Sequence, residues 1–270
     1  MEGSGMSSKQ TSMLRKGLRM MISILILGAS MSAEAGSFGI GGNTMNWKEE
    51  VLLHDGRVIV VERHLLFADH PKSDSRERTL AAESISFALP ESSTNIVWKT
   101  EFRNDVPEPN SLGPLLLGVI DGNAYIATGP AGCIAYNKWG RPNPPYVVFK
   151  YVNDGWKQIP LKEFPATLVR ANLMSAPDWR ETKSYYTVED VTQQMQGRNI
   201  AESARTILRE PVGSAGGRCG EMVYDGKGGW IGTGWFKDQP TYEACLKYCE
   251  WQKIDAQHCP CGNLFKGKQQ

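Results

Sequence analysis

The sequence predicts a mainly β protein: an antiparallel sheet domain of about nine strands, followed by a small helical, disulfide-rich C-terminal appendage. Three observations carry this prediction: short runs that alternate apolar and polar residues, tight-turn signals between them, and a helical pattern with clustered cysteines near the C-terminus. A sandwich, a barrel and a propeller-like array all fit this spacing of turns. The chain has no exact internal repeat, which makes a regular propeller the least favoured of the three.

Tight turns are expected to join most strands into hairpins. The three hairpins cover 51–61, 115–128 and 146–161, and each has an Asp-Gly pair at its turn. That pair favours the two-residue turns that match the twist of paired strands. The runs 84–89 and 95–102 alternate with period two, as half-buried strands do. A further short strand is expected at 133–136. Loops are expected at 69–79 and 103–114.

Helical signals replace the strand pattern after residue 161. Thr187 has a capping hydroxyl and acidic residues follow it, which predicts the start of a helix. A second helix is expected over 200–209, before Pro211, and a third over 240–251. The glycine-rich stretch 212–234 between them predicts a loop or a short hairpin.

The N-terminus predicts a cleaved export signal over 1–35. Basic residues precede the apolar run 20–29, and the small residues Ala33 and Ala35 follow it. The run is about ten residues long, whereas a membrane-spanning helix needs ~20. An uncleaved inner-membrane anchor is the alternative, and Met6 or Met13 is a plausible true start. The mature protein is expected in the periplasm or outside the cell.

The rest of the chain is expected to divide into a flexible lead-in, 36–46, an antiparallel β domain, 47–165, and a helical, glycine-rich and cysteine-containing region, 166–270. Without 1–35 the chain carries 26 of the 30 basic and 27 of the 29 acidic residues. This balance, with no long basic run, argues against a nucleic-acid or anionic-membrane partner.

The six cysteines predict three disulfides in an exported protein. Cys245 and Cys249 share one helix face, and a bond between them would distort the helix. Cys259 and Cys261 are too close together to bridge without strain. The favoured pairing therefore joins the 245–249 helix to the 259–261 tail by two bonds and joins the remaining two cysteines, Cys133 and Cys219. Other pairings stay open, as does zinc binding, although the spacing is not that of a zinc knuckle.

No sequence motif indicates catalysis, a metal centre or a cofactor. Nucleophile-elbow, phosphate-loop, dinucleotide and zinc-protease motifs are all missing from the sequence. His54 and His64 are expected as ordinary strand residues. Glu49 and Glu50 are expected as solvated residues on opposite strand faces, so they do not converge on a substrate. We therefore predict no catalytic residue, no metal ligand and no cofactor.

Two segments are candidate binding surfaces. The proline-stiffened loop 137–146 contains Trp139, Arg141 and Tyr146, residue types that dominate binding hot spots. The glycine-rich stretch adds Trp230 and Trp235, which could stack on sugar rings or on a protein. The structural alternative is that these aromatic residues pack against the sheet or beside the cystines.

Three stretches, 47–57, 135–146 and 149–151, read WKEEVLLHDGR, AYNKWGRPNPPY and FKY. With them, 47–170 resembles a group of uncharacterised exported bacterial proteins. The resemblance implies a bacterial source and a periplasmic location, and it transfers no activity, ligand or site residue.

These observations favour a non-enzymatic exported protein that binds a protein or glycan of the cell envelope. One alternative is an envelope hydrolase, which would need dispersed acids or His54 and His64 to meet in the fold. Another is an inhibitor or immunity-type protein that neutralises a secreted toxin.

Overall fold

The computed structural model describes residues 43–68, 78–92, 94–103, 106, 109–197, 199–213, 217 and 219–266. The predicted export signal, most of the lead-in and most of the 69–79 loop lie outside these residues. Within the described part of the chain, no helix combines the length and the apolar character that crossing a membrane requires.

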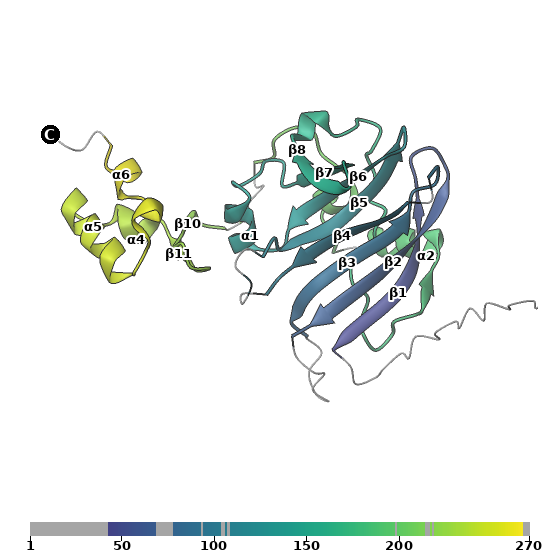
Figure 1. Cartoon of the computed structure of the whole chain (residues 1–270), viewed down its shortest axis with the longest axis horizontal. Helices are drawn as coiled ribbons and strands as arrows, with labels where there is room; N and C mark the ends of the chain where they lie inside the picture. The colour runs from purple at the N-terminus through teal and green to yellow at the C-terminus, as the bar shows by residue number, and fades with distance from the viewer. Residues whose placement is uncertain are drawn as a thin grey trace, which may run out of the picture. The chain divides into compact units, whose positions relative to one another are not determined.

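Two β-sheets form the larger part of the fold (Figure 1). The five-stranded sheet has the order β4-β3-β2-β1-β9, and only β9 is parallel to its neighbour. Its strands are β1 (Thr44–Leu52), β2 (Val58–Phe67), β3 (Leu80–Ala88), β4 (Asn95–Glu101) and β9 (Tyr185–Tyr186). The four-stranded sheet runs in chain order through β5 (Leu112–Ile120), β6 (Asn123–Pro130), β7 (Val147–Val152) and β8 (Gly155–Ile159).

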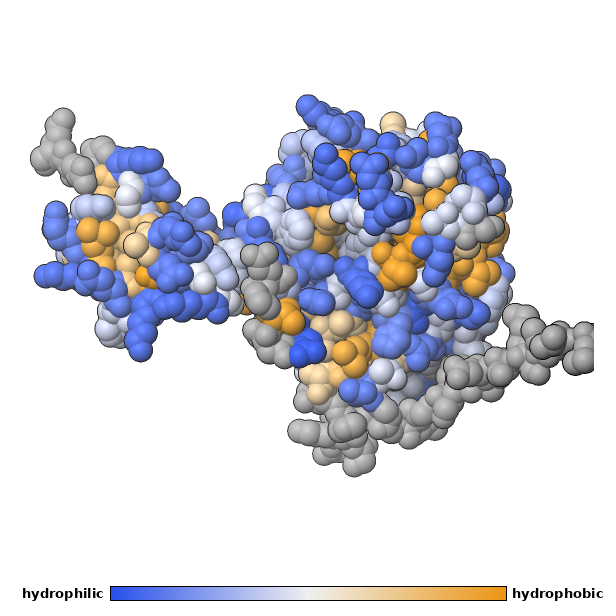
Figure 2. Space-filling model, in the orientation of Figure 1, coloured by the Kyte–Doolittle hydropathy of each residue, from blue (hydrophilic) through white to orange (hydrophobic). Residues whose placement is uncertain are grey.

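The two sheets pack face to face, which makes the predicted β domain a sandwich. One buried cluster combines Val51, Ile85 and Trp98 of the five-stranded sheet with Leu117 and Ile126 of the four-stranded sheet. In β1, buried and exposed residues alternate because its outer face meets solvent. Figure 2 shows hydrophilic and apolar side chains mixed on the surface of this part of the molecule.

The four-stranded sheet is buried on its second face as well. Phe164, Leu168 and Ile207 pack there against residues of β5, β6 and β7. This double burial explains why β5 and β6 contain continuous apolar runs instead of alternating ones. Gly118 in β5 leaves room for this cover, because a Cβ there would lie 2.5 Å from Leu168 Cδ2.

The helical elements are short. They are α1 (Cys133–Lys138), η1 (Leu161–Glu163), α2 (Val188–Met195), α3 (Glu202–Arg205), α4 (Gly234–Lys237), α5 (Tyr242–Trp251), η2 (Ala256–His258) and α6 (Cys261–Leu264). As predicted, α2 begins after Thr187, whose side chain and that of Asp190 form a reciprocal capping box. The glycine-rich stretch contains the hairpin of β10 (Met222–Tyr224) and β11 (Trp230–Gly232).

Three local expectations were wrong. The strand expected at 133–136 is helix α1, because Gly132 at φ 154° turns the chain out of β6 and Tyr136 N–H then bonds to its carbonyl. The helix expected over 200–209 ends at Arg205, and Ile207 continues as extended chain because its N–H bonds to Val169 O at 2.8 Å. The loop expected over 103–114 ends where β5 begins, at Leu112.

The favoured disulfide pairing is confirmed. Cys133 bonds to Cys219, Cys245 to Cys261 and Cys249 to Cys259, with Cα–Cα distances of 5.1, 5.8 and 5.9 Å. The last two bonds lie in a small core of their own. This core, which we call the cystine core, is built around Phe236 and closed by Ile254 and Phe265.

Candidate binding cavity at the β10–β11 hairpin

The start of the β10–β11 hairpin is attached to α1 by a covalent bond and several hydrogen bonds. The disulfide between Cys133 and Cys219 is the covalent link. Asn137 accepts a bond from Met222 N at 3.0 Å and donates one to Gly220 O at 2.9 Å. The side-chain amide of Asn137 therefore bonds to one backbone N–H and one backbone C=O of the incoming segment, as a neighbouring strand would.

Arg141, a predicted binding residue, reinforces the same attachment. Its guanidinium donates to the carbonyls of Gly220 and Cys219, both at 3.0 Å. The guanidinium carbon also lies 4.9 Å from the ring centre of Tyr136, a favourable cation–π distance. Arg141 itself has φ 57°, in the left-handed region that few non-glycine residues adopt. The bend places its side chain where the hairpin begins.

Trp139 and Tyr146 from the same loop turn inward. Trp139 donates to Asn110 O at 2.8 Å and packs edge-on against Phe149. Tyr146 is 5% exposed, and its hydroxyl lies 2.7 Å from Ser203 O. Burial raises the pKa of Tyr146. These contacts match the structural alternative for the 137–146 loop, and a binding role for its three residues stays a prediction.

A cavity of about 560 Å³ opens between α1 and the hairpin. Its lining is mostly apolar and includes Phe102 after β4, Pro109, Ile134 on α1, and Tyr224 and Trp230 of the hairpin. Ile134 is 48% exposed, so a large aliphatic side chain faces this opening without being covered. The volume falls in the range of small-molecule and side-chain pockets.

The aromatic wall of the cavity comes from one cross-strand pair. Tyr224 and Trp230 are opposite each other in the hairpin register, and their ring centres are 5.4 Å apart. Such pairs stabilise two-stranded ribbons and present a broad, rigid surface. Trp230 was predicted as a binding residue. Tyr224 was not, although its position at the other end of the Asp-Gly-Lys-Gly-Gly turn could have revealed the pair.

Two polar side chains of the lining already have partners. The ammonium of Lys138 donates to the Pro109 carbonyl, and the hydroxyl of Ser111 donates to Glu101 O at 3.2 Å. These two side chains are therefore not free to orient a polar ligand, and most of the lining offers apolar and aromatic contact.

The other tryptophan of the glycine-rich stretch, Trp235, does not line this cavity. It lies on α4 and is 64% exposed. Trp251 at the end of α5 is 72% exposed, and sequence reasoning did not select it. The binding role predicted for Trp235 stays a prediction.

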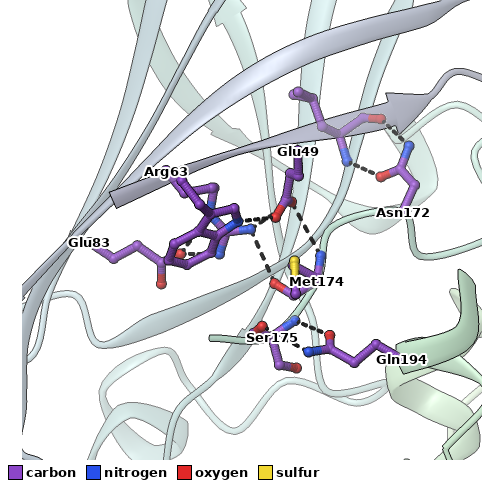
Figure 3. A network of polar contacts seen from close by, with 9 residues as sticks. Glu49, Arg63, Glu83, Asn172, Met174, Ser175 and Gln194 are labelled. Carbon is purple, nitrogen blue, oxygen red and sulfur yellow. Dashed lines mark hydrogen bonds and ion pairs between the residues drawn. The ribbon is translucent and has the colours of Figure 1, made fainter. Parts of the chain in front are cut away.

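A charged cluster lies inside the sandwich, away from any cavity described above (Figure 3). Arg63 donates to Glu49 at 2.8 Å and to Glu83 at 3.0 Å, and all three side chains are buried. Trp47 Nε1 donates to the second oxygen of Glu49 at 2.6 Å. Burial alone would lower the pKa of Arg63, but the carboxylates of Glu83 and Glu49 outweigh it, so the pKa is raised.

The cluster corrects one expectation. Glu49 was expected in solvent, yet it is fully buried because odd-numbered residues of β1 point into the sandwich. Both oxygens of Glu49 accept bonds from fixed donors. Glu49 therefore balances the charge of Arg63 and links β1 to β2. Its partner in sequence, Glu50, lies on the other face, as predicted.

The remaining candidates for chemistry are either far apart or already crosslinked. His54 lies in the β1–β2 turn, while His64 is opposite Asn46 on β2, six residues beyond the start of that strand. Six strand residues span roughly 20 Å. The sulfurs of Cys249, Cys259 and Cys261 lie within 4.8 Å of one another, but each belongs to a disulfide and is not a thiolate.

No protein-family model matches this chain, and neither the curated proteins nor the solved structures contain a match.

Proposed function

We propose that this protein is an exported, non-enzymatic binding module whose cavity at the β10–β11 hairpin receives an apolar side chain of a protein partner in the cell envelope. The observation that carries the proposal is the cavity itself: about 560 Å³ with a mostly apolar lining. Its walls come from the sandwich and the hairpin, and the Cys133–Cys219 bond joins the two.

Three disulfides support the exported location, since they persist in oxidising compartments. The predicted signal at 1–35 supports it independently. In such a compartment the hairpin stays attached to α1, and the cavity is already formed before a partner arrives. A preformed site lowers the entropy that binding loses.

The lining favours a protein partner over a glycan. Sugar recognition needs several free hydrogen-bond donors and acceptors beside the stacking ring, and Lys138 and Ser111 already bond to backbone carbonyls. Tyr224 and Trp230 offer instead a surface for a leucine or phenylalanine side chain. Such a residue would be desolvated on all sides, as hot-spot anchors are.

The first test uses the uncharged dye N-phenyl-1-naphthylamine, which fluoresces in apolar sites and carries no anionic group. We expect saturable binding to the oxidised protein, and at least about tenfold weaker binding by Trp230→Ala and Ile134→Asp. The matched control is Trp251→Ala, which removes an exposed tryptophan outside the cavity and is expected to bind like the wild type. Equal binding by all three variants would overturn the proposal.

The second test separates protein from glycan. Acetylated leucine and phenylalanine amides are expected to compete with the dye, whereas envelope oligosaccharides are not. Competition by the oligosaccharides alone would assign the cavity to a glycan and overturn the choice of a protein partner.

A further inference from the structure

A second cavity, of about 350 Å³, lies between α2, the end of β1 and the segments 170–172 and 205–206. It shares no residue with the hairpin cavity. One part of its wall is apolar and consists of Leu52, Val188, Val191 and Met195, while another part carries two arginines. We call it the α2 cavity.

The backbone places the two arginines, Arg170 and Arg205, on adjacent segments. Arg170 forms an antiparallel bridge with Thr206, and Ala171 N donates to Arg205 O at 2.9 Å. Asn172 then bonds to Leu52 O at 3.0 Å and to both the N–H and C=O of Leu117 at 2.8 Å. These bonds join the segment that carries Arg170 to both sheets, and the bond between Ala171 and Arg205 holds the second segment beside it.

Each of the two guanidinium groups has N–H donors that make no hydrogen bond within the described residues. Arg170 is exposed and makes no side-chain hydrogen bond or ion pair within the described residues. Arg205 donates to Gly197 O at 2.9 Å, but its Nε is buried and has no partner in the described part of the chain. Only Arg205 Nη2 makes that bond, so within the described residues Nη1 stays available to donate to a ligand oxygen.

The acidic residue in the wall, Glu50, forms no ion pair with either arginine within the described residues. One of its oxygens accepts from Tyr185 OH at 3.0 Å and the other from Val188 N, the first amide of α2, at 2.9 Å. Counted together, Glu50, Arg170 and Arg205 give the lining one net positive charge. The cavity therefore combines an unpaired cationic side with an apolar side.

We propose that the α2 cavity binds a small carboxylate with an apolar body. The carboxylate would accept from Arg170 and Arg205, since planar guanidinium groups match carboxylate geometry. The body would pack against Val188, Val191 and Met195. Two sources have this chemistry: a free acid of medium chain length and the C-terminal carboxylate of a peptide that ends in an apolar residue.

Calorimetric titration with defined probes tests the proposal. Octanoate is compared with octanamide, which has the same body without the charge, and the peptide Gly-Gly-Leu with its C-terminal amide. We expect at least one acid to bind saturably and at least tenfold more tightly than its amide. Binding by octanoate alone assigns a free acid, and binding by the peptide alone assigns a chain terminus. Equal binding of acid and amide, or no saturable binding, overturns the proposal.

Variants locate the site. Arg170→Gln changes an exposed side chain with no partner in the described residues, so it should fold normally, and we expect it to lose at least tenfold in affinity. Arg180→Gln, another exposed arginine that does not line the cavity, is the control and should bind like the wild type. Trp230→Ala should also retain binding. If Trp230→Ala abolishes acid binding while Arg170→Gln does not, the acid occupies the hairpin cavity and the proposal fails.

Discussion

The sandwich and the cystine core bury their apolar residues in different ways. The sandwich combines residues of nine strands and the segments that cover them into three adjoining buried clusters. The cystine core is a single small cluster around Phe236, and Cys245, Cys249 and Cys261 are themselves part of it. A large apolar core can hold its fold without crosslinks, whereas a core of this size needs them. The comparison teaches that two of the three disulfides lie where hydrophobic burial is weakest.

The largest effect should come from removing the two disulfides of the cystine core. Replacing Cys245, Cys249, Cys259 and Cys261 by alanine removes two bonds that typically contribute about 2–4 kcal/mol each. We expect α5 to unfold while the sandwich stays folded. Hydrogen exchange read by mass spectrometry should show loss of protection in Tyr242–Trp251 and full protection in β2.

The Cys133→Ala/Cys219→Ala double variant is the control for that experiment. It removes one bond but leaves both bonds of the cystine core, so α5 should keep its protection. If α5 keeps its protection without the four cystine-core cysteines, the small core is stable by burial alone. That result would contradict the contrast between the two cores.

The next largest effect should come from Arg63 inside the sandwich. Arg63→Met leaves Glu49 and Glu83 buried without their cation, and breaking a buried pair in this way costs about 3–5 kcal/mol. Urea unfolding followed by circular dichroism should show the lower free energy of unfolding. Arg57→Met, which removes exposed ion pairs to Asp55 and Glu91, is the control and should cost no more than about 1 kcal/mol. Equal costs would show that the buried cluster is dispensable.

The smallest effect concerns the start of α2, which covers one end of the sandwich. Thr187→Ala removes the capping hydroxyl and should cost about 1 kcal/mol. The control is Thr192→Ala, an exposed threonine on the same helix that makes no cap. A similar cost for both variants in urea unfolding would argue against the cap.

Asp190 makes the same helix start sensitive to pH. The hydrogen bond from Lys183, followed by that from the Thr187 backbone, lowers the pKa of Asp190 below its ordinary value. A depressed folded-state pKa contributes stability above the unfolded-state value, and that contribution is lost as pH falls through the folded-state pKa. Asp190→Asn should flatten the acid side of the stability curve. An unchanged curve would contradict this.

Local patterns account for what could be predicted. The Asp55-Gly56 turn and the Thr187 cap depend on neighbouring residues, and both are present in the structure. The pairing of Cys245 and Cys249 with the tail followed from their shared helix face. The run 133–136 was ambiguous because four residues fit a strand or a helix, and only its neighbours in space decided between them.

The sequence by itself determined the strand-rich fold class, the hairpins and the disulfide framework, since alternation, turn residues and cysteine spacing act over a few residues. The tertiary structure alone decided which polar residues are buried and where the cavities lie. Glu49, Arg63 and Glu83 come from three strands, and the hairpin cavity joins Phe102, Ile134 and Trp230. Such groups meet only through sheet register and packing, which no short stretch of sequence encodes.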